Sequence, residues 1–282
     1  MAKVLLLGVD GLLGSCLESA LGKDNEVNLI TTAKKSQSDF HFEYSLVGLR
    51  KLIRQVQPDV VINCIAVTSP TSTFITMLKA NTILPIHLAL LSIWFKFKVI
   101  HFSTNAVFSG RHTINFETSL PAPKNWYGFT KLAGDFSCFR NLVIRTSFIG
   151  SSPKSTVRSG LVFKLQNLEK GSEYKVLDDH IWNGVTTDVL CEMVLGLVKI
   201  KSLPKGIIHI GTRIGSSRQI LVKSLLDILN RNDINIIFQT TKRSRNLSLY
   251  SQRVQLFSSL WKYSSISEDS DLRMLLSKMK IY

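Results

Sequence analysis

Short, largely apolar runs alternate with helical patterns along the first half of the chain. Residues 4–7 are fully apolar, and the runs at 60–63 and 98–103 are mostly apolar rather than alternating, which is typical of strands buried on both faces of a parallel sheet. Two further strands are expected at residues 26–31 and 141–145, and helices after residue 14, at 45–56 and at 73–94. The alternation predicts an α/β fold with a doubly wound, Rossmann-like parallel sheet.

The pattern changes near residue 150. We expect helices at residues 159–170, 188–198 and 217–230, with strands at 174–177 and 206–210, separated by polar connections. The pattern therefore predicts a Rossmann-like domain over residues 1–150, to which residues 183–212 return, and a smaller α/β domain formed mainly by residues 151–282.

A glycine-rich segment follows the first apolar run. Gly8, Gly11 and Gly14 form Gly-x-x-Gly-x-x-Gly at a turn from strand to helix. Glycines there let the backbone turn tightly and approach a pyrophosphate, which rests on the helix N-terminus. The sequence therefore predicts dinucleotide binding by the segment, and the residues expected to contribute are Gly8, Asp10, Gly11, Leu12, Leu13 and Gly14.

The end of the second strand indicates which dinucleotide is bound. An acidic residue there would accept hydrogen bonds from the ribose hydroxyls of NAD, whereas basic residues suit a 2′-phosphate. Lys34 and Lys35 stand at this point, and the next acid is Asp39. NADP(H) is therefore favoured over NAD(H).

Further cofactor contacts are expected where later strands end. Cys64, Ile65 and Ala66 follow the strand at 60–63, and Asn81 lies on the long helix after them. In an open parallel sheet, ligands bind outside the carboxyl ends of the strands.

The fifth strand and the helix after it carry candidate catalytic groups. Ser103 and Thr104 end the strand at 98–103, while Tyr127 and Lys131 stand four residues apart, on one face of a helix. A phenol with a pKa of about 10 needs a nearby ammonium to exchange protons near neutrality. A hydroxyl at the strand end, the Tyr127 phenol and the Lys131 ammonium can converge on one carbonyl, with Tyr127 as general acid.

The composition and charge of the chain limit the partners that it can be expected to bind. The 282 residues are 45% hydrophobic and 20% charged, as in ordinary globular proteins, and they carry a net charge of +15. Positive charge can attract nucleic acid or steer small polyanionic substrates. The basic residues are scattered, with only a short run at 242–245, so we expect no nucleic-acid partner.

The location and the metal content are also expected from the sequence. The four cysteines (Cys16, Cys64, Cys138 and Cys191) show no paired or metal-like spacing, so we expect free thiols in a reducing cytoplasm and no metal site. The apolar stretch at 83–95 is too short to span a bilayer, so no membrane partner is expected. A homodimer is compatible with the sequence.

With these residues in view, the chain resembles the extended short-chain dehydrogenases/reductases, and within them the dTDP-4-dehydrorhamnose reductase group. The stretches that carry the resemblance are 8–14, 57–63, 102–110, 126–134 and 144–147, with Glu117 and weaker similarity at 181–188 and 243–249.

The resemblance implies an enzyme that uses NAD(P)H to reduce the 4-keto group of a 4-keto-6-deoxy sugar nucleotide, for deoxysugar and surface-polysaccharide synthesis. It implies that Tyr127 protonates the nascent alkoxide and that Thr104 orients the carbonyl. Lys131 would hold the nicotinamide ribose and lower the pKa of Tyr127. The other residues implied to bind are Ser103 for the cofactor and Thr104, Asn105, Val107, Phe108 and Trp182 for the substrate.

The chain departs from the group at one point. Asn105 and Ala106 follow Thr104 where the group usually has Asp-Tyr or Asp-Cys. A dehydratase of this superfamily would need an Asp-Glu pair there, so dehydration is disfavoured. An epimerase of the same superfamily remains an alternative. So does a non-catalytic NADP-binding regulatory subunit like that of methionine adenosyltransferase.

Overall fold

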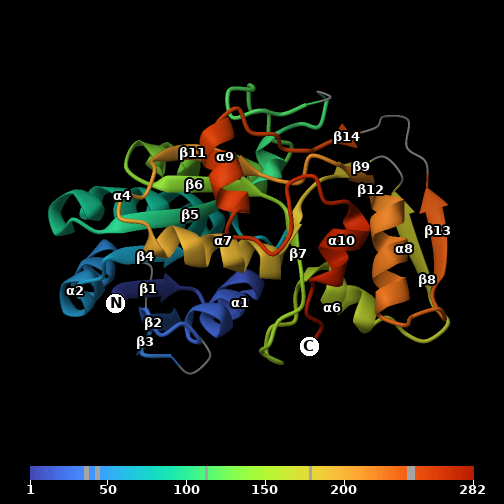
Figure 1. The fold of residues 1–282 in the computed structure, drawn as a ribbon, viewed down its shortest axis with the longest axis horizontal. Helices are drawn as coiled ribbons and strands as arrows, with labels where there is room; N and C mark the ends of the chain where they lie inside the picture. Colours follow the sequence, from blue (N-terminus) through green and yellow to red (C-terminus); the bar gives the residue numbers. More distant parts are fainter. Residues whose placement is uncertain (35–37, 42–44, 112–113, 178–179, 240–244) are drawn as a thin grey trace.

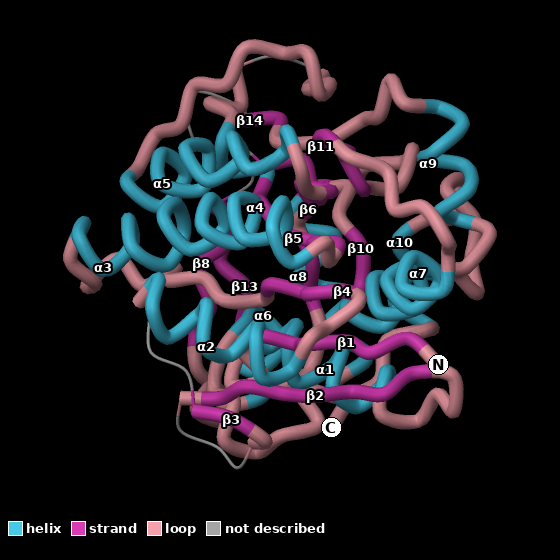
Figure 2. Tube along the Cα trace, turned by 90° about the vertical axis from the view of Figure 1, so that its left-hand side faces the viewer, coloured by secondary structure: helices cyan, strands magenta, loops and turns pink. Residues whose placement is uncertain are grey.

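The computed structural model describes residues 1–282 except 35–37, 42–44, 112–113, 178–179 and 240–244. Its central element is a parallel sheet of seven strands in the order β11-β6-β5-β4-β1-β2-β3 (Figures 1 and 2). The strands are β1 (Ala2–Leu7), β2 (Val27–Ala33), β3 (Phe40–His41), β4 (Val60–Asn63), β5 (Lys98–Thr104), β6 (Leu142–Thr146) and β11 (Gly206–Ile210). The predicted doubly wound α/β fold is confirmed.

Two apolar layers cover the sheet because its strands are apolar on both faces. In β1, Val4 and Leu6 belong to one buried cluster, and Leu5 and Leu7 belong to the other. Helices α1 (Leu12–Leu21) and α7 (Thr187–Lys199) pack on the first face, and helices α2 (Leu46–Val56) and α4 (Leu84–Phe95) pack on the second. This burial explains why the strands are largely apolar in sequence.

The strand order reverses at β1, which lies between β2 and β4. At such a switch point the loops that follow neighbouring strands diverge and leave a crevice for a ligand. The turn after β1 and the loop after β4 both border this point. The glycine-rich turn and Cys64–Ala66 are therefore placed where the sequence predicts them to act.

The helix predicted at 73–94 is interrupted. It is built as α3 (Phe74–Leu78), a π-helical segment η1 (Lys79–Ile83) and α4, and the extra residue of a π-turn shifts the side chains that follow. By length and composition, residues Phe74–Phe95 could cross a membrane, and half of that stretch is buried inside the protein. This apolar stretch is longer than the 83–95 expected from the sequence.

The second half contributes to both parts of the molecule. Strand β11 pairs with β6, and α7 packs on α1, so the returning residues extend the central sheet and one of its layers. A smaller group of elements lies at the right of Figure 1. Its members are α6 (Gly160–Gln166), β8 (Glu173–Leu177), β9 (His180–Trp182), β12 (Ser216–Ser217), α8 (Arg218–Ile228), β13 (Asn235–Gln239), β14 (Arg245–Asn246) and α10 (Leu272–Ser277). The exact division into two domains stays a prediction.

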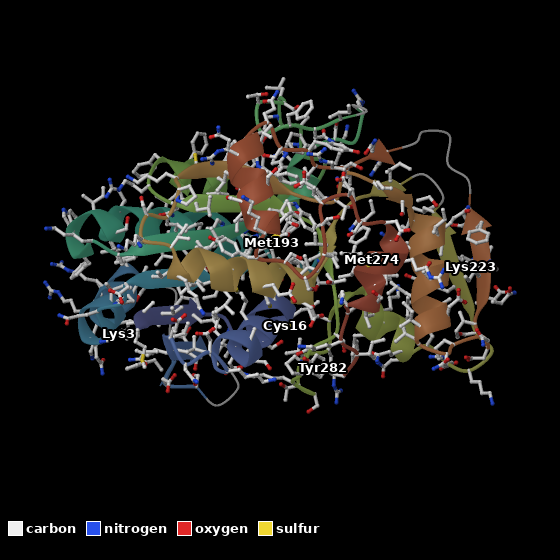
Figure 3. All side chains as sticks on the ribbon, viewed as in Figure 1. Lys3, Cys16, Met193, Lys223, Met274 and Tyr282 are labelled. Carbon is white, nitrogen blue, oxygen red and sulfur yellow. The ribbon has the colours of Figure 1, made fainter. Side chains whose placement is uncertain are left out.

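The remaining elements join these parts: β7 (Phe148–Ile149), β10 (Val185–Thr186), α5 (Trp126–Gly134), α9 (Val254–Trp261), and the 3₁₀ segments η2 (Asn105–Val107) and η3 (Asp135–Phe139). Met193 of α7 is fully buried between layers, whereas Lys223 of α8 stands at the surface (Figure 3). The four cysteines are free, as predicted.

Candidate active site

The glycine turn after β1 is held by backbone contacts. Gly8 has a φ of +89°, and the N–H groups of Gly8 and Val9 donate to the Thr32 carbonyl oxygen at 3.1 and 3.2 Å. A Cβ at Gly14 would lie 2.1 Å from the Gly8 carbonyl oxygen, so only glycine lets α1 pack against the turn. These two glycines are required by the protein's own structure.

Gly11 is different. A Cβ built on it meets only the Gly8 carbonyl oxygen, at 3.5 Å, which is ordinary van der Waals contact. Its φ of −94° is accessible to any residue. The protein alone therefore leaves room for a side chain at Gly11, whereas a ligand approaching the backbone would require a glycine there.

The N-terminus of α1 is suited to an anion. No side chain caps it, and its first turn contains no acidic residue. Leu12 and Leu13 occupy the first two helical positions, so their N–H groups are among those that a helix cannot satisfy internally. The turn, the helix end and the crevice fit the pyrophosphate of a dinucleotide.

The end of β2 is tied to the glycine turn. The Asp10 carboxylate accepts a hydrogen bond from the Lys34 N–H at 2.8 Å, which holds the exposed Lys34 beside the turn. The Asp39 carboxylate accepts hydrogen bonds from the N–H and the hydroxyl of Thr31, at 2.7 and 3.0 Å. These bonds attach Asp39 to β2 at a residue before the end of the strand. Lys35, the other predicted cofactor residue here, lies outside the described residues, as do positions 243–244.

The loop after β4 faces the same turn. A Cβ at Gly8 would lie 2.8 Å from Ile65 Cγ1, so the two segments are in close contact. The Ile65 N–H donates to Asn63 Oδ1 at 3.1 Å, which shapes the loop that contains Cys64 and Ala66. Burial raises the pKa of the Cys64 thiol and keeps it uncharged.

Asn81 lies in η1, within the predicted helical stretch, and its side chain is hydrogen-bonded to the protein itself. Its amide oxygen accepts from the Val67 N–H at 2.9 Å, and its amide nitrogen donates to the Val67 carbonyl oxygen and to Thr130 Oγ1, at 3.0 and 3.1 Å. The side chain is fully buried by these contacts. It therefore joins the loop after β4 to α5, and its direct contact with a cofactor stays a prediction.

The three candidate catalytic residues meet where β5 ends. Helix α5 begins after Asn125, whose side chain accepts from the Gly128 N–H at 2.8 Å. A Cβ at Gly128 would lie 2.3 Å from the Ala106 carbonyl oxygen, so glycine lets this helix start directly against η2. As a result, the partly buried Tyr127 phenol, whose pKa is raised by burial, lies beside the Thr104 hydroxyl, which acts on that pKa in the opposite direction.

The surroundings of the Lys131 side chain differ from those that the family resemblance implies. Its side chain is 2% exposed, and its Nζ lies 3.2 Å from His101 Nε2 and donates to the Phe102 carbonyl oxygen. Burial lowers the pKa of Lys131 to about 8, whereas burial raises the pKa of Tyr127 above its ordinary value of 10.0. In the ligand-free protein the lysine would lose its charge before the phenol ionises, so it does not lower the pKa of Tyr127.

A buried ion pair beneath the site was missed by the sequence analysis. Arg145 Nε of β6 donates to Asp135 Oδ2 at 2.7 Å, and both side chains are 3% exposed. The Asp135 carboxylate raises the pKa of both Tyr127 and Lys131. Two signals were available, since Tyr127, Lys131 and Asp135 are spaced by four and Arg145 interrupts an apolar strand.

Several predicted binding residues are packed inside the protein. Val107 and Phe108 are buried with Leu249, and the Phe108 ring contacts His209 and Arg145. Their side chains support η2, which corrects the expectation that they touch substrate. Ser103 is likewise buried, and its hydroxyl has no hydrogen-bond partner among the described residues.

Two other predicted substrate residues are partly exposed. Asn105 donates through Nδ2 to the Leu247 carbonyl oxygen at 3.3 Å, which joins η2 to the C-terminal half. Trp182 donates through its indole N–H to Ser147 Oγ at 2.9 Å. Both stay candidates for substrate contact.

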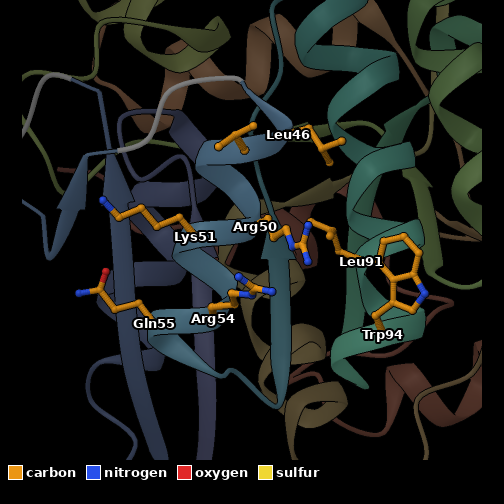
Figure 4. Close-up of a pocket in the computed structure, with 8 residues that line it drawn as sticks. Leu46, Arg50, Lys51, Arg54, Gln55, Leu91 and Trp94 are labelled. Atoms are coloured by element: carbon orange, nitrogen blue, oxygen red, sulfur yellow. The ribbon is translucent and has the colours of Figure 1, made fainter.

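A separate groove lies between α2 and α4. It has a volume of about 600 Å³ and is lined by Leu46, Val47, Arg50, Lys51, Arg54, Gln55, Leu91 and Trp94. Arg50 and Arg54 project toward Leu91 and Trp94, while Lys51 and Gln55 point away (Figure 4). None of the candidate catalytic residues lines this groove, so it is not part of the candidate active site.

The comparisons with known proteins agree with this geometry. A sequence-family model described as "RmlD substrate binding domain" matches residues 2–242. The dTDP-4-dehydrorhamnose reductase of Escherichia coli (strain K12) is 27% identical over 210 residues, which are 70% of this chain and 67% of that protein. The methionine adenosyltransferase 2 subunit beta of Danio rerio is 23% identical over 279 residues, which are 90% of this chain and 84% of that protein.

A solved structure supports the fold. The dTDP-4-dehydrorhamnose reductase (rfbD) of Bacillus anthracis str. Ames, in complex with NADP, superposes with a TM-score of 0.77. The match covers 90% of this chain and 92% of that chain at 21% sequence identity, so it shows a shared fold.

Proposed function

The chain belongs to the RmlD substrate binding domain family, and from this membership we propose that it is a nicotinamide-dependent oxidoreductase that reduces the 4-keto group of a 4-keto-6-deoxy sugar nucleotide. The observation that carries the proposal is the meeting of Thr104 and Tyr127 at the carboxyl end of β5, on the same sheet edge as the glycine turn. The relatives named dTDP-4-dehydrorhamnose reductase support the reaction class.

The residues present fit a dinucleotide. The open Cβ position at Gly11 and the uncapped N-terminus of α1 would receive its pyrophosphate. Lys34, held beside the turn through its backbone, would face a 2′-phosphate and favour NADP(H) over NAD(H). When bound, the reduced nicotinamide supplies a hydride.

The chain's own residues would supply position and a proton. Thr104 lies beside Tyr127, so a carbonyl oxygen accepted between the two hydroxyls would be oriented by one and protonated by the other. The raised pKa of Tyr127 keeps the phenol protonated at neutral pH, as a proton donor must be. Placement beside the cofactor supplies the remaining part of the rate enhancement.

Two measurements test the proposal together. NADPH consumption at about 340 nm, the absorption band of the reduced nicotinamide, is expected with at least one 4-keto-6-deoxy sugar nucleotide from a panel made in situ. Tyr127→Phe should bind NADPH normally but lose about 100- to 10,000-fold in turnover. The control is Tyr263→Phe, at an exposed tyrosine outside the site, which should keep full turnover.

The outcomes separate the alternatives. NADPH binding without turnover on any sugar nucleotide would contradict the reductase and favour a non-catalytic NADP-binding regulatory subunit; one relative is named as a subunit, the methionine adenosyltransferase 2 subunit beta of Danio rerio. Interconversion of sugar epimers without net NADPH consumption would favour an epimerase.

A further inference from the structure

A chain of buried polar side chains runs beneath the candidate active site. Asn63 Nδ2 of β4 lies 3.1 Å from His101 Nδ1 of β5, and His101 Nε2 lies 3.2 Å from Lys131 Nζ of α5. His101 and Asn63 are completely buried. These three polar side chains therefore connect the loop after β4 with Lys131 of the candidate active site.

The backbone fixes the orientation of the Asn63 amide. The Ile65 N–H is a donor and lies 3.1 Å from Asn63 Oδ1, so the oxygen must stay on that side. The Asn63 NH₂ group, which can only donate, then faces His101 Nδ1. His101 Nδ1 must accept that hydrogen bond and carries no proton.

The proton of the imidazole is consequently on the other nitrogen. Burial lowers the pKa of His101 well below 6.5, so the ring is neutral and its single proton is on Nε2. That Nε2–H points at Lys131 Nζ. An ammonium has three donors and no acceptor, whereas an uncharged amine has a lone pair that can accept this hydrogen bond and still donate to the Phe102 carbonyl oxygen.

We infer that Asn63 and His101 are positioning residues that favour the uncharged amine of Lys131 in the ligand-free protein, so that at alkaline pH dinucleotide binding draws a proton onto Lys131. The inference rests on the proposed function, because it takes a dinucleotide as the ligand. The proton comes from the solvent and forms the third N–H bond of the ammonium. The hydrogen bond from His101 Nε2 to Lys131 Nζ breaks, and no other bond changes.

The other charged groups around Lys131 agree with this coupling. Asp135 of η3 favours the ammonium, but its carboxylate is already paired with Arg145 of β6. The Cys64 thiol, on the loop after β4, is uncharged because burial raises its pKa. The negative phosphates of a dinucleotide would add the further stabilisation that the ammonium needs.

The first test uses the ligand-free protein. Long-range ¹H–¹⁵N correlation spectra separate the Nε2–H from the Nδ1–H form of each histidine, and the signal missing in His101→Gln identifies His101. The expected result is a neutral Nε2–H ring that does not titrate near neutral pH. An Nδ1–H ring would overturn the inference. His87→Gln, at a half-buried histidine of α4, is the matched control and should leave the His101 signal unchanged.

The second test measures protons on binding. Calorimetry of NADPH binding in two buffers with different ionisation heats should show uptake of close to one proton at about pH 9, falling toward pH 7, because the ligand-free pKa of Lys131 is about 8. NADPH affinity should correspondingly fall about tenfold per pH unit above that value.

Asn63→Asp should reverse the direction of the hydrogen bonds that join residue 63, His101 and Lys131, with almost no change in side-chain shape. Its carboxylate still accepts from Ile65 and accepts from His101 Nδ1–H, so Nε2 becomes an acceptor for the Lys131 ammonium. Proton uptake at about pH 9 should then drop close to zero. Equal uptake by the two proteins, or none in either, would overturn the inference. Absence of NADPH binding would count against the proposed function instead, and the histidine spectra would still decide the inference.

Discussion

Arg145 Nε of β6 and Asp135 Oδ2 of η3 lie 2.7 Å apart, in an ion pair whose side chains are 3% exposed. The pair joins the central sheet to the segment that directly follows the helix of Tyr127 and Lys131. Because water cannot replace either partner, each charge depends on the other.

Arg145→Met should therefore lower the free energy of unfolding by about 3–5 kcal/mol, since it leaves a buried carboxylate uncompensated. Urea denaturation measures this change. Arg213→Met is the control, because the Arg213 side chain is 52% exposed in its pair with Glu268 and should change stability by less than about 1 kcal/mol. An equal loss of unfolding free energy in the two variants would show that the buried pair stabilises the fold no more than the exposed pair does.

Gly11→Ala should separate ligand binding from folding. The added Cβ meets only ordinary contact in the protein, so stability should change by less than about 1 kcal/mol, while dinucleotide affinity is lost. Gly14→Ala is the contrast, because its Cβ would lie 2.1 Å from a backbone oxygen and should destabilise the fold itself. Thermal unfolding and NADPH titration of both variants make the comparison. Unchanged NADPH affinity in Gly11→Ala would place the pyrophosphate elsewhere.

Acid should destabilise the protein through its buried histidines. Burial lowers the pKa of His209 to about 4 from an ordinary 6.5, so the unfolded chain binds a proton that the folded protein rejects between these values. Stability is complete above pH 6.5 and falls as the pH decreases, by about 1.4 kcal/mol per pH unit for each such histidine. Urea denaturation between pH 7 and pH 5 checks the slope, and His209→Gln should reduce it. A free energy of unfolding independent of pH in this range would contradict the burial of neutral histidines.

Lys34 should set the cofactor preference. Lys34→Ala is expected to weaken NADPH binding about tenfold, or about 1.4 kcal/mol, and to leave NADH binding unchanged, because only NADPH carries the 2′-phosphate. Lys23→Ala, at an exposed lysine after α1, controls for the loss of one positive charge. Parallel losses for both dinucleotides would remove Lys34 from this role.

The fold was predictable because its signals are local. The sequences of β1, β4 and β5 are mostly apolar, which indicates burial on both faces of the sheet. The glycines after β1 indicate a tight turn. The glycine spacing also placed the predicted dinucleotide turn beside the switch point. Short strands such as β7, β10 and β12 were missed because two residues carry no periodicity.

The environment of the site was less predictable because it depends on distant contacts. Tyr127 and Lys131 share a helix, yet the pKa of each follows from burial and from Asp135, which no spacing rule quantifies. The hydrogen-bond partners of the buried Asn81 side chain, Val67 and Thr130, lie 14 and 49 residues away in sequence and could not be identified from it. Val107 and Phe108 follow Thr104 directly, but the fold turns them inward.

The most direct test of the proposed function follows the hydride itself. NADPH labelled with deuterium at C4 of the nicotinamide is supplied with the 4-keto-6-deoxy sugar nucleotide that supports turnover, and the product is examined by NMR and mass spectrometry. Transfer of the label to C4 of the sugar, in the wild type and only weakly in Tyr127→Phe, is the predicted result. A product without the label at C4 would contradict the reductase assignment.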